Sequence, residues 1–171
     1  MVKMSQCMIV KNEEKNIEQA LSWGKGIFFE QIVVDTGSTD RTVELAKKMG
    51  AIVYFFPWID DFAAAKNFAL EQAKGKWIAF LDADEYFLKR DRKKLKQTME
   101  LLDKGFILID GVQRKGNALL CALVNLDQEG NAFSTEKQVR IFRNDKNIRY
   151  VGKIHEQITG LNGTNLIMAD I

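Results

Sequence analysis

The first 85 residues alternate short apolar runs with helical patterns, and this order constrains the fold more than any other feature of the chain. Four apolar runs suit strands that are buried on both faces: residues 4–10, 27–35, 51–56 and 76–81. Segments with helical spacing stand between them, and the connections are short. Strands joined through helices lie parallel, with right-handed crossovers. The sequence therefore predicts an α/β fold with a mostly parallel, Rossmann-like sheet flanked by helices.

Three helices are predicted between these strands. Asn12 is expected to cap the first, with Glu13 and Glu14 in its first turn, where carboxylates complement the helix dipole. The Ser-Thr-Asp segment at residues 38–40 is expected to cap the second. The third is predicted over residues 61–74, where alanine is frequent.

The second half of the chain changes character. A helix is predicted near residues 93–104, followed by strands at 106–109, 118–126 and 139–142 that polar turns connect. This order predicts a short mixed or antiparallel part after the parallel one. After Ile158 the sequence shows turn signals and no clear closing element, which is expected of a shortened relative or of the first domain of a longer protein.

Composition and charge favour a soluble protein without a nucleic-acid partner. The formal net charge is only +2, which gives no electrostatic case for nucleic acid. The basic run at residues 89–96 is expected to be a solvated helix face, with a phosphate or membrane-surface patch as the alternative. Cys7 and Cys121 match no metal spacing and indicate a reducing compartment. No transmembrane segment or signal-peptide layout is found, so a cytoplasmic location is expected, with a membrane-peripheral one left open.

A cluster of acidic residues marks the candidate site. Asp82, Asp84 and Glu85 directly follow the apolar run at residues 77–80. Carboxylates so close together repel one another, and burial makes this worse. Mg²⁺ or Mn²⁺ relieves both penalties, prefers oxygen ligands and is usually shared with substrate phosphates. Ligands of parallel sheets bind at the carboxyl ends of the strands, so we predict a metal-assisted nucleotide site there.

Three motifs resemble glycosyltransferase family 2 with the GT-A fold. They are Met-Ile-Val-Lys-Asn-Glu-Glu at residues 8–14, Val-Val-Asp-Thr-Gly-Ser-Thr-Asp at 33–40 and Leu-Asp-Ala-Asp-Glu at 81–85. Residues 58–68 and 152–158, the latter with a late His-Glu pair, are similar to a bacterial subgroup whose members often carry helical repeats after the transferase domain. The resemblance covers roughly residues 4 to 158.

The resemblance implies a metal-dependent, inverting glycosyltransferase. Its donor would be a nucleotide-sugar, with a UDP-sugar favoured, and its acceptor a saccharide, a lipid or a peptide. Residues 1–171 would form a single GT-A-like domain, with a nucleotide-binding half at 1–85 and an acceptor-side half, either whole or truncated, at 86–171.

The family's metal and base positions can be carried over residue by residue. Asp84 matches the second Asp of the D-x-D motif and would bind Mg²⁺ or Mn²⁺. Asp82 would lie nearer the ribose or reach the ion through water, and His155 would be a further ligand. Glu156 is the leading general base. Because the family's usual Glu-Asp pair is missing here, other candidates for the base stay open, namely Asp127 and Glu129.

Several residues would hold the donor by the same resemblance. Asp35 would accept a hydrogen bond from uracil N3–H, and Glu14 or Glu13 would contact the ribose or base. Lys66 would approach the diphosphate, and Arg140 could offset its charge. The full donor-binding set is Asn12, Glu13, Glu14, Asp35, Gly37, Ser38, Lys66, Asn67, Asp82 and Arg140.

Two other functions stay open at the level of sequence. An inactive or truncated UDP-binding domain is the alternative outside enzymology. A D-x-D phosphatase or phosphotransferase also places two aspartates after an apolar strand. However, Tyr86 stands where that motif expects Thr or Val, and the motif normally follows the first strand rather than the fourth.

Overall fold

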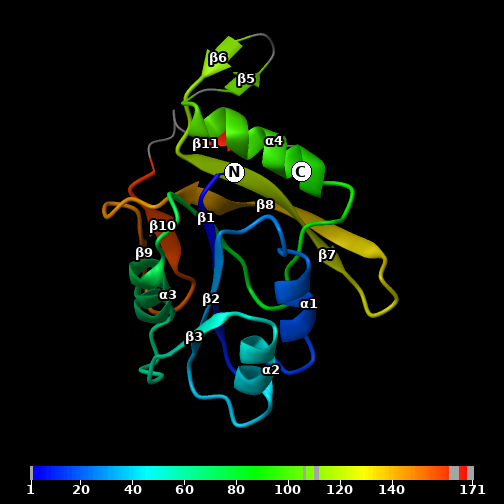
Figure 1. Ribbon diagram of the computed structural model, residues 1–171, viewed down its shortest axis with the longest axis vertical. Coiled ribbons are helices and arrows are strands. Elements are labelled where there is room, and N and C mark those ends of the chain that lie inside the picture. The colour runs from blue at the N-terminus through cyan, green and yellow to red at the C-terminus, as the bar shows by residue number, and fades with distance from the viewer. Residues whose placement is uncertain (1, 106, 110–111, 162–165, 169–171) are drawn as a thin grey trace.

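The centre of the computed structural model is a mixed seven-stranded sheet (Figure 1). The structure describes residues 2–105, 107–109, 112–161 and 166–168. The strand order is β11-β7-β8-β4-β1-β2-β3. Four neighbouring strands pair in parallel: β1 (Met4–Val10), β2 (Glu30–Asp35), β3 (Ile52–Phe55) and β4 (Trp77–Phe80). The predicted parallel sheet is therefore confirmed.

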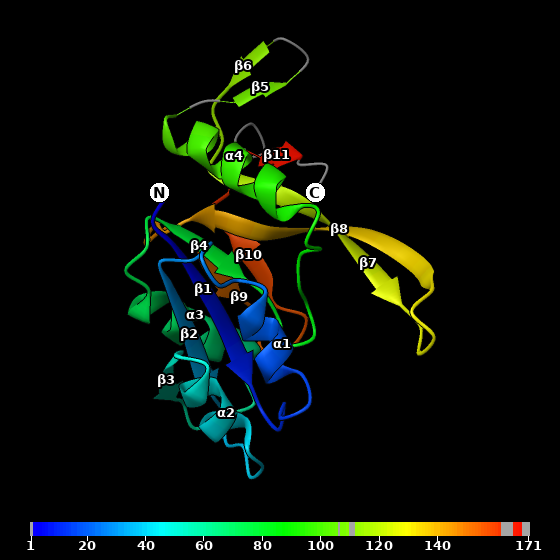
Figure 2. The ribbon, with the colours of Figure 1, turned by 45° about the vertical axis from the view of Figure 1, so that its right-hand side comes forward.

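Helices cover both faces of the sheet (Figure 2). One face packs against α1 (Ile17–Ser22), α2 (Thr42–Lys48) and α4 (Arg92–Asp103), and the other against α3 (Phe62–Gln72). The alternation of side chains along each strand explains this arrangement. In β1, Met8 packs with α1 and α2, whereas Cys7 packs with α3.

The second half adds antiparallel strands. β7 (Ala118–Leu126) and β8 (Ala132–Arg143) form a long hairpin, and β8 pairs antiparallel with β4. The short β11 (Leu166–Met168) runs parallel to β7. Two further pairs lie outside the main sheet: β5 (Ile107–Ile109) with β6 (Val112–Arg114), and β9 (Arg149–Val151) with β10 (Gln157–Thr159). The predicted mixed C-terminal part is confirmed, with β8 much longer than the predicted 139–142.

Two of the predicted helix starts are wrong. α1 begins at Ile17, and Asn12 instead adopts a left-handed conformation with φ of 58°. α2 begins at Thr42, because residues 38–40 form a loop that bonds to the loop after β1. The start of α3 is confirmed, since the Asp61 side chain caps it by accepting a hydrogen bond from the Ala64 N–H at 2.8 Å.

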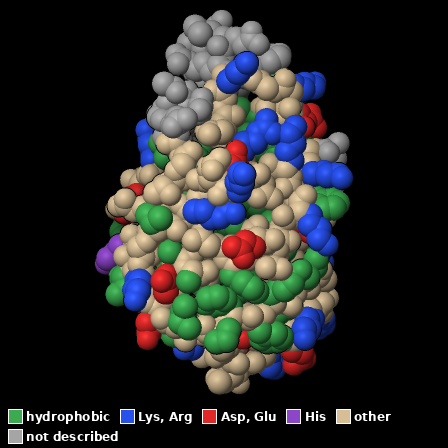
Figure 3. Space-filling model, turned by 90° about the vertical axis from the view of Figure 1, so that its left-hand side faces the viewer, with side chains coloured by type: hydrophobic (Ala, Val, Ile, Leu, Met, Phe, Trp, Pro, Cys, Tyr) green, Lys and Arg blue, Asp and Glu red, His purple; other side chains and the backbone are tan. Residues whose placement is uncertain are grey.

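One side of the molecule exposes a band of apolar side chains (Figure 3). Exposed large hydrophobic residues on the elements of this side include Ile52 and Phe55 of the edge strand β3, Phe62 of α3 and Val151 of β9. Contiguous apolar surface of this kind is typical of faces that contact something other than water.

Candidate functional site

Three parallel strands end at the same edge of the sheet. Val10, the last residue of β1, pairs with Asp35 at the end of β2, and Phe80 at the end of β4 pairs with Cys7. The loops after β1, β2 and β4 therefore leave the sheet side by side. This confirms that Asp35 and the loops that carry Asn12 and Asp82 come together at one edge.

The loop after β1 is locked to the loop after β2. The Asn12 N–H donates to Ser38 Oγ at 2.9 Å, and Asn12 Oδ1 accepts from the Thr39 N–H at 2.8 Å. The buried Asp35 carboxylate accepts from the N–H groups of Gly37 and Ser38 at 3.1 Å. Four of the predicted donor-binding residues thus form one hydrogen-bonded unit.

Glu13 and Glu14 already have partners within the protein. The Glu13 carboxylate accepts from the Asn16 amide at 2.8 Å, and Glu14 Oε2 lies 3.3 Å from Arg41 Nε. The expected ribose or base contact of these two side chains would have to compete with those partners.

The acidic segment after β4 lies between two cations. Asp82 Oδ1 is 3.8 Å from Lys66 Nζ, and Asp82 Oδ2 is 3.6 Å from Arg140 Nη2. The Asp82 side chain is 42% exposed, and Asp84 is exposed. Both predicted metal-binding carboxylates are therefore open to a ligand that arrives from solvent.

Glu85 and Arg140 form a buried ion pair behind Asp82. Arg140 donates to Glu85 Oε1, and each side chain is 11% exposed. Burial raises the pKa of Glu85, although the adjacent Arg140 opposes this shift. Glu85 is therefore not a solvated surface residue.

Lys66 is buried at the edge of the site. Its Nζ lies 2.6 Å from Glu156 Oε1 and about 5 Å from the ring centroids of Phe80 and Tyr150. Only 7% of the Lys66 side chain is exposed, against 17% for Glu156. The predicted base Glu156 is therefore ion-paired in this structure.

Asn67 was expected to bind the donor, but its amide is already used. Asn67 Nδ2 donates to the Tyr150 carbonyl, and Asn67 Oδ1 accepts from the Tyr150 N–H, each at 2.9 Å. Both hydrogen-bonding ends of the side chain hold β9 against α3. Asn67 thus supports the site from behind rather than lining it.

The predicted metal set of Asp82, Asp84 and His155 is not assembled. Among the residues that the structure describes, no three His, Cys, Asp or Glu side chains are grouped so that they could hold a metal ion. His155 is exposed. It lies in the irregular segment between β9 and β10, where its backbone has a φ of 54°. Asp82 and Asp84 still suit Mg²⁺ or Mn²⁺, since such ions are held by one or two carboxylates together with substrate phosphates.

The other candidates lie apart from this edge. Asp127 and Glu129 belong to the turn of the β7–β8 hairpin, where hydrogen bonds from the Asn131 backbone and side chain chiefly lower the pKa of Asp127. That shift makes Asp127 a poorer base. The second arginine of β8, Arg143, packs 4.4 Å from the centre of the Trp77 ring at the start of β4, away from this edge.

Sequence reasoning missed two contacts that shape the site. Tyr150 covers Lys66 although it is 84 residues away in the chain, and the Glu85–Arg140 pair spans 55 residues. Neither contact follows from local spacing. The unusual composition of the Leu-Asp-Ala-Asp-Glu segment was the one signal that a cation would lie nearby.

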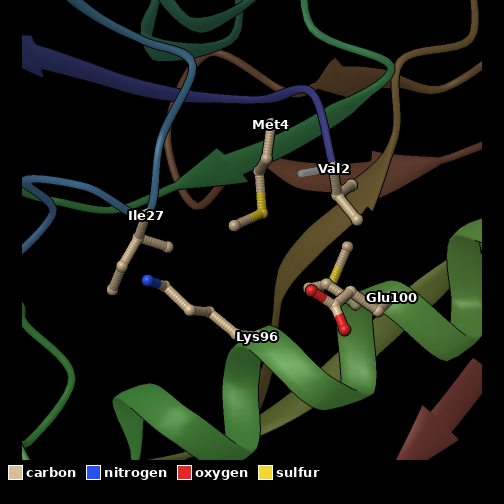
Figure 4. A pocket seen from close by; sticks show the side chains of 6 residues that line it. Val2, Met4, Ile27, Lys96 and Glu100 are labelled. Carbon is tan, nitrogen blue, oxygen red and sulfur yellow. The ribbon is translucent and has the colours of Figure 1, made fainter.

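Two cavities lie at the opposite edge of the sheet. One, of about 110 Å³, lies between the first residues of β1 and α4 (Figure 4). It is lined by Val2, Met4, Ile27, Lys96, Met99 and Glu100. The other is lined by Gly105, Lys115, Gly116, Asn117 and Arg143. Both are remote from the polar loops, so they are not the candidate site.

Within the described ranges, no helix has the length and apolarity to cross a bilayer.

Sequence comparisons agree with the arrangement of these motifs. A model of glycosyl transferase family 2 matches residues 5–151. The chain is 32% identical over 158 residues to a TPR repeat-containing protein of Synechococcus elongatus, covering 92% of this chain and 36% of that protein. It is also 32% identical over 154 residues to the SPbeta prophage-derived glycosyltransferase SunS of Bacillus subtilis, covering 88% and 33%. The chain thus spans about a third of the length of these relatives.

Solved structures share the fold at low identity. S. aureus TarS 1–349 in complex with UDP has a TM-score of 0.55 and 21% identity, over 88% of this chain and 50% of that one. Glucosyl-3-phosphoglycerate synthase from Mycobacterium tuberculosis, with Mn²⁺, UDP and glucosyl-3-phosphoglycerate, gives 0.50 and 21% over 70% and 43%. Mannosyltransferase PcManGT from Pyrobaculum calidifontis, with GDP-Man and Mn²⁺, gives 0.51 and 22% over 70% and 35%. These likenesses confirm the GT-A-type fold, and together with the family match over most of its length they establish that the chain belongs to glycosyl transferase family 2.

Proposed function

We propose that this chain is the donor-binding domain of a metal-dependent, inverting glycosyltransferase that moves a sugar from a nucleotide-sugar to a saccharide, lipid or peptide acceptor. The observation that carries the proposal is the single sheet edge at which Asp35, Asp82, Lys66 and Arg140 meet. Lys66 and Arg140 flank the Asp82 carboxylate there, and Lys66 supplies the positive charge that suits an anionic diphosphate held together with a divalent ion. Residues 1–171 are taken as one domain, and the free, buried cysteines fit a cytoplasmic setting.

A UDP-sugar is the proposed donor. The Asp35 carboxylate accepts backbone hydrogen bonds from Gly37 and Ser38, and a carboxylate has about four lone-pair positions. The carboxylate therefore keeps acceptor capacity for the uracil N3–H. Neighbouring folds hold UDP in two cases and GDP-Man in a third, so the fold alone does not select the base.

Asp82 and Asp84 are the proposed carboxylates for Mg²⁺ or Mn²⁺, and His155 is not retained. When bound, such an ion offsets the negative charge that builds on the leaving diphosphate. Lys66 adds a cation beside Asp82. Glu156 is the proposed base, and it becomes available when the diphosphate competes for Lys66, its present partner at 2.6 Å.

The test is a calorimetric and thermal-shift panel of UDP-, GDP-, CMP- and ADP-sugars with and without Mn²⁺. We expect UDP-sugars to bind most tightly, and more tightly with Mn²⁺. Asp35→Asn should weaken the preference for uridine, because the amide has a single acceptor oxygen and an NH₂ group that donates and cannot accept. Asp103→Asn, at the end of α4 beside the start of β4, is the matched control. A purine preference would refute the role of Asp35, and binding that ignores Mn²⁺ would refute the roles of Asp82 and Asp84.

A UDP-binding domain without transferase activity is the second candidate. It is favoured by the ion pair that occupies Glu156. Turnover of a UDP-sugar that disappears in a folded Asp84→Ala variant would support the enzyme. Tight binding of UDP with no turnover toward any acceptor would support the binding domain.

A further inference from the structure

We infer that Glu85 and Arg140 are positioning residues that hold Asp82 ready for a divalent ion and the diphosphate of the donor. The inference rests on the proposed function of this edge. It extends that function to Glu85, which has no assigned role in it, and it gives Arg140 a role behind the site instead of on the diphosphate.

Glu85 closes the turn that carries Asp82. The Glu85 N–H donates to the Asp82 carbonyl at 3.1 Å, and Glu85 Oε2 accepts from the Asp82 N–H, also at 3.1 Å. The first and last residues of the segment are thereby bonded to each other in both directions. The side chain of Glu85 supplies one of these two bonds, so the conformation at Asp82 depends on it.

Arg140 ties this turn to the sheet. Arg140 donates to the other carboxylate oxygen, Glu85 Oε1. Because Ala79 of β4 pairs with Ile141 of β8, Arg140 lies beside the end of β4, directly where the acidic turn begins. A side chain that projects from a central strand is held more rigidly than one on a loop. The turn is therefore braced against a strand of the main sheet.

This arrangement is a poor way to stabilise a protein. Both side chains are 11% exposed, and a buried ion pair is often no more stable than apolar residues of the same volume. Arg140 Nε is also buried with no hydrogen-bond partner in the part of the chain that the structure describes, which adds a further cost. Local costs of this kind are expected at functional sites.

The Asp82 carboxylate is oriented by two cations but makes no short hydrogen bond to either of them. Its carboxylate oxygens lie 3.6 Å from Arg140 Nη2 and 3.8 Å from Lys66 Nζ. Both distances exceed those of strong charge-assisted hydrogen bonds, which are about 2.7 to 2.9 Å. The two cations orient the carboxylate while its lone pairs stay open to an incoming ligand.

The experiment measures the dissociation constant of UDP with Mn²⁺ and with EDTA, and takes the ratio of the two as the gain from metal. The variants are Glu85→Gln, Arg140→Lys and the double variant Glu85→Met/Arg140→Met. Residues that orient metal ligands typically change metal affinity by 10- to 100-fold, so we expect each variant to lose roughly tenfold of the gain, with roughly unchanged affinity in EDTA. Asp103→Asn, which removes one side of an ion pair at the opposite edge, should keep the full gain.

The double variant separates positioning from stability. An apolar pair of similar volume should fold as well as the ion pair. If it folds with the wild-type melting temperature and keeps the gain from metal, the inference is refuted. If it fails to fold, the pair serves stability and the inference is refuted as well. A wild-type chain that shows no gain from Mn²⁺ contradicts the metal role in the proposed function itself, and that result is recognised before any variant is made.

Discussion

Lys66 occupies a position that few lysines tolerate. Its ammonium group is almost fully removed from water, and the groups around it are the Glu156 carboxylate, the more distant Asp82 and two aromatic rings. A buried ammonium loses much hydration free energy, which a close carboxylate and ring faces recover in part. The stability of the fold at this position therefore depends on the partners of Lys66, above all on Glu156.

Replacing Lys66 with methionine tests this dependence. We expect Lys66→Met to lower the free energy of unfolding by about 3 kcal/mol at pH 7, because Glu156 is left without a partner in a mostly buried place. Adding Glu156→Gln should restore part of the loss, so a double-mutant cycle followed by urea unfolding should show coupling of about 1 kcal/mol or more. Losses that simply add would show that the two side chains act independently.

The two cysteines should not react with thiol reagents in the folded protein. Cys7 and Cys121 are both buried and unpaired, and burial raises the pKa of Cys121 to about 11. Since the thiolate is the reactive form, an aromatic disulfide reagent at pH 8 should label neither residue until urea is added. Release of the coloured thiol, measured by absorbance, checks this. Rapid labelling of native protein would contradict the packing of β1 against α3.

At the scale of elements, the side chain of Asn67 in α3 bonds to the backbone of β9. Asn67 uses both ends of its amide on the backbone of Tyr150, as a neighbouring strand would. Asn67→Ala should cost about 2 kcal/mol, since two buried backbone groups lose their partners. Hydrogen exchange of the Tyr150 amide should accelerate with it. Asn67→Asp, which keeps the acceptor, is the matched control and should protect that amide better than alanine does.

The pair between α4 and the start of β4 should respond to acid. Lys76 Nζ lies 2.6 Å from Asp103 Oδ1, and this hydrogen bond is the chief cause that lowers the pKa of Asp103 below 3.8. A lowered folded-state pKa gives stability that is present above the unfolded pKa and lost as pH falls through the folded one. The stability difference between wild type and Asp103→Asn should therefore be constant near neutrality and shrink below pH 3.8. Urea titrations at both pH values measure it, and a difference that grows on acidification would contradict the assignment.

The elements with long or repeated patterns were predictable from the sequence, and the short or non-local ones were not. The parallel strands follow from their apolar runs, and α3 follows from its alanine-rich sequence. The conformation of Asn12 does not, because it depends on Ser38, which is 26 residues away. Asp35 and Asp82 were located by the rule that ligands bind at carboxyl ends. The partner of Glu85 was not, because it depends on the register of β8 against β4.

At the scale of the whole molecule, the site is assembled from segments that no single element supplies. The loops after β1, β2 and β4 contribute to it, and so do α3 and β8. A ligand that binds all of them should stabilise all of them together. At a concentration of 100 times its dissociation constant, a ligand adds about 2.7 kcal/mol to the free energy of unfolding.

Hydrogen exchange should reveal this coupling. With UDP and Mn²⁺, we expect slower exchange in the loops at residues 12–14, 37–40 and 82–85, because the ligand spans them. The hairpin turn at residues 127–131 should be unchanged and serves as the internal control. Protection confined to one loop would indicate that the ligand does not bridge the sheet edge.

The antiparallel course of β8 has one more consequence. Because β8 runs against β4, with Ala79 opposite Ile141, its earlier residues continue past the end of β4 and pair only with β7 (Figure 2). The hairpin thus extends beyond the same edge of the sheet from which the polar loops emerge. The length of the hairpin can change by whole residue pairs while β4 keeps its register against β8, so an insertion or deletion at its turn would leave the polar loops in place.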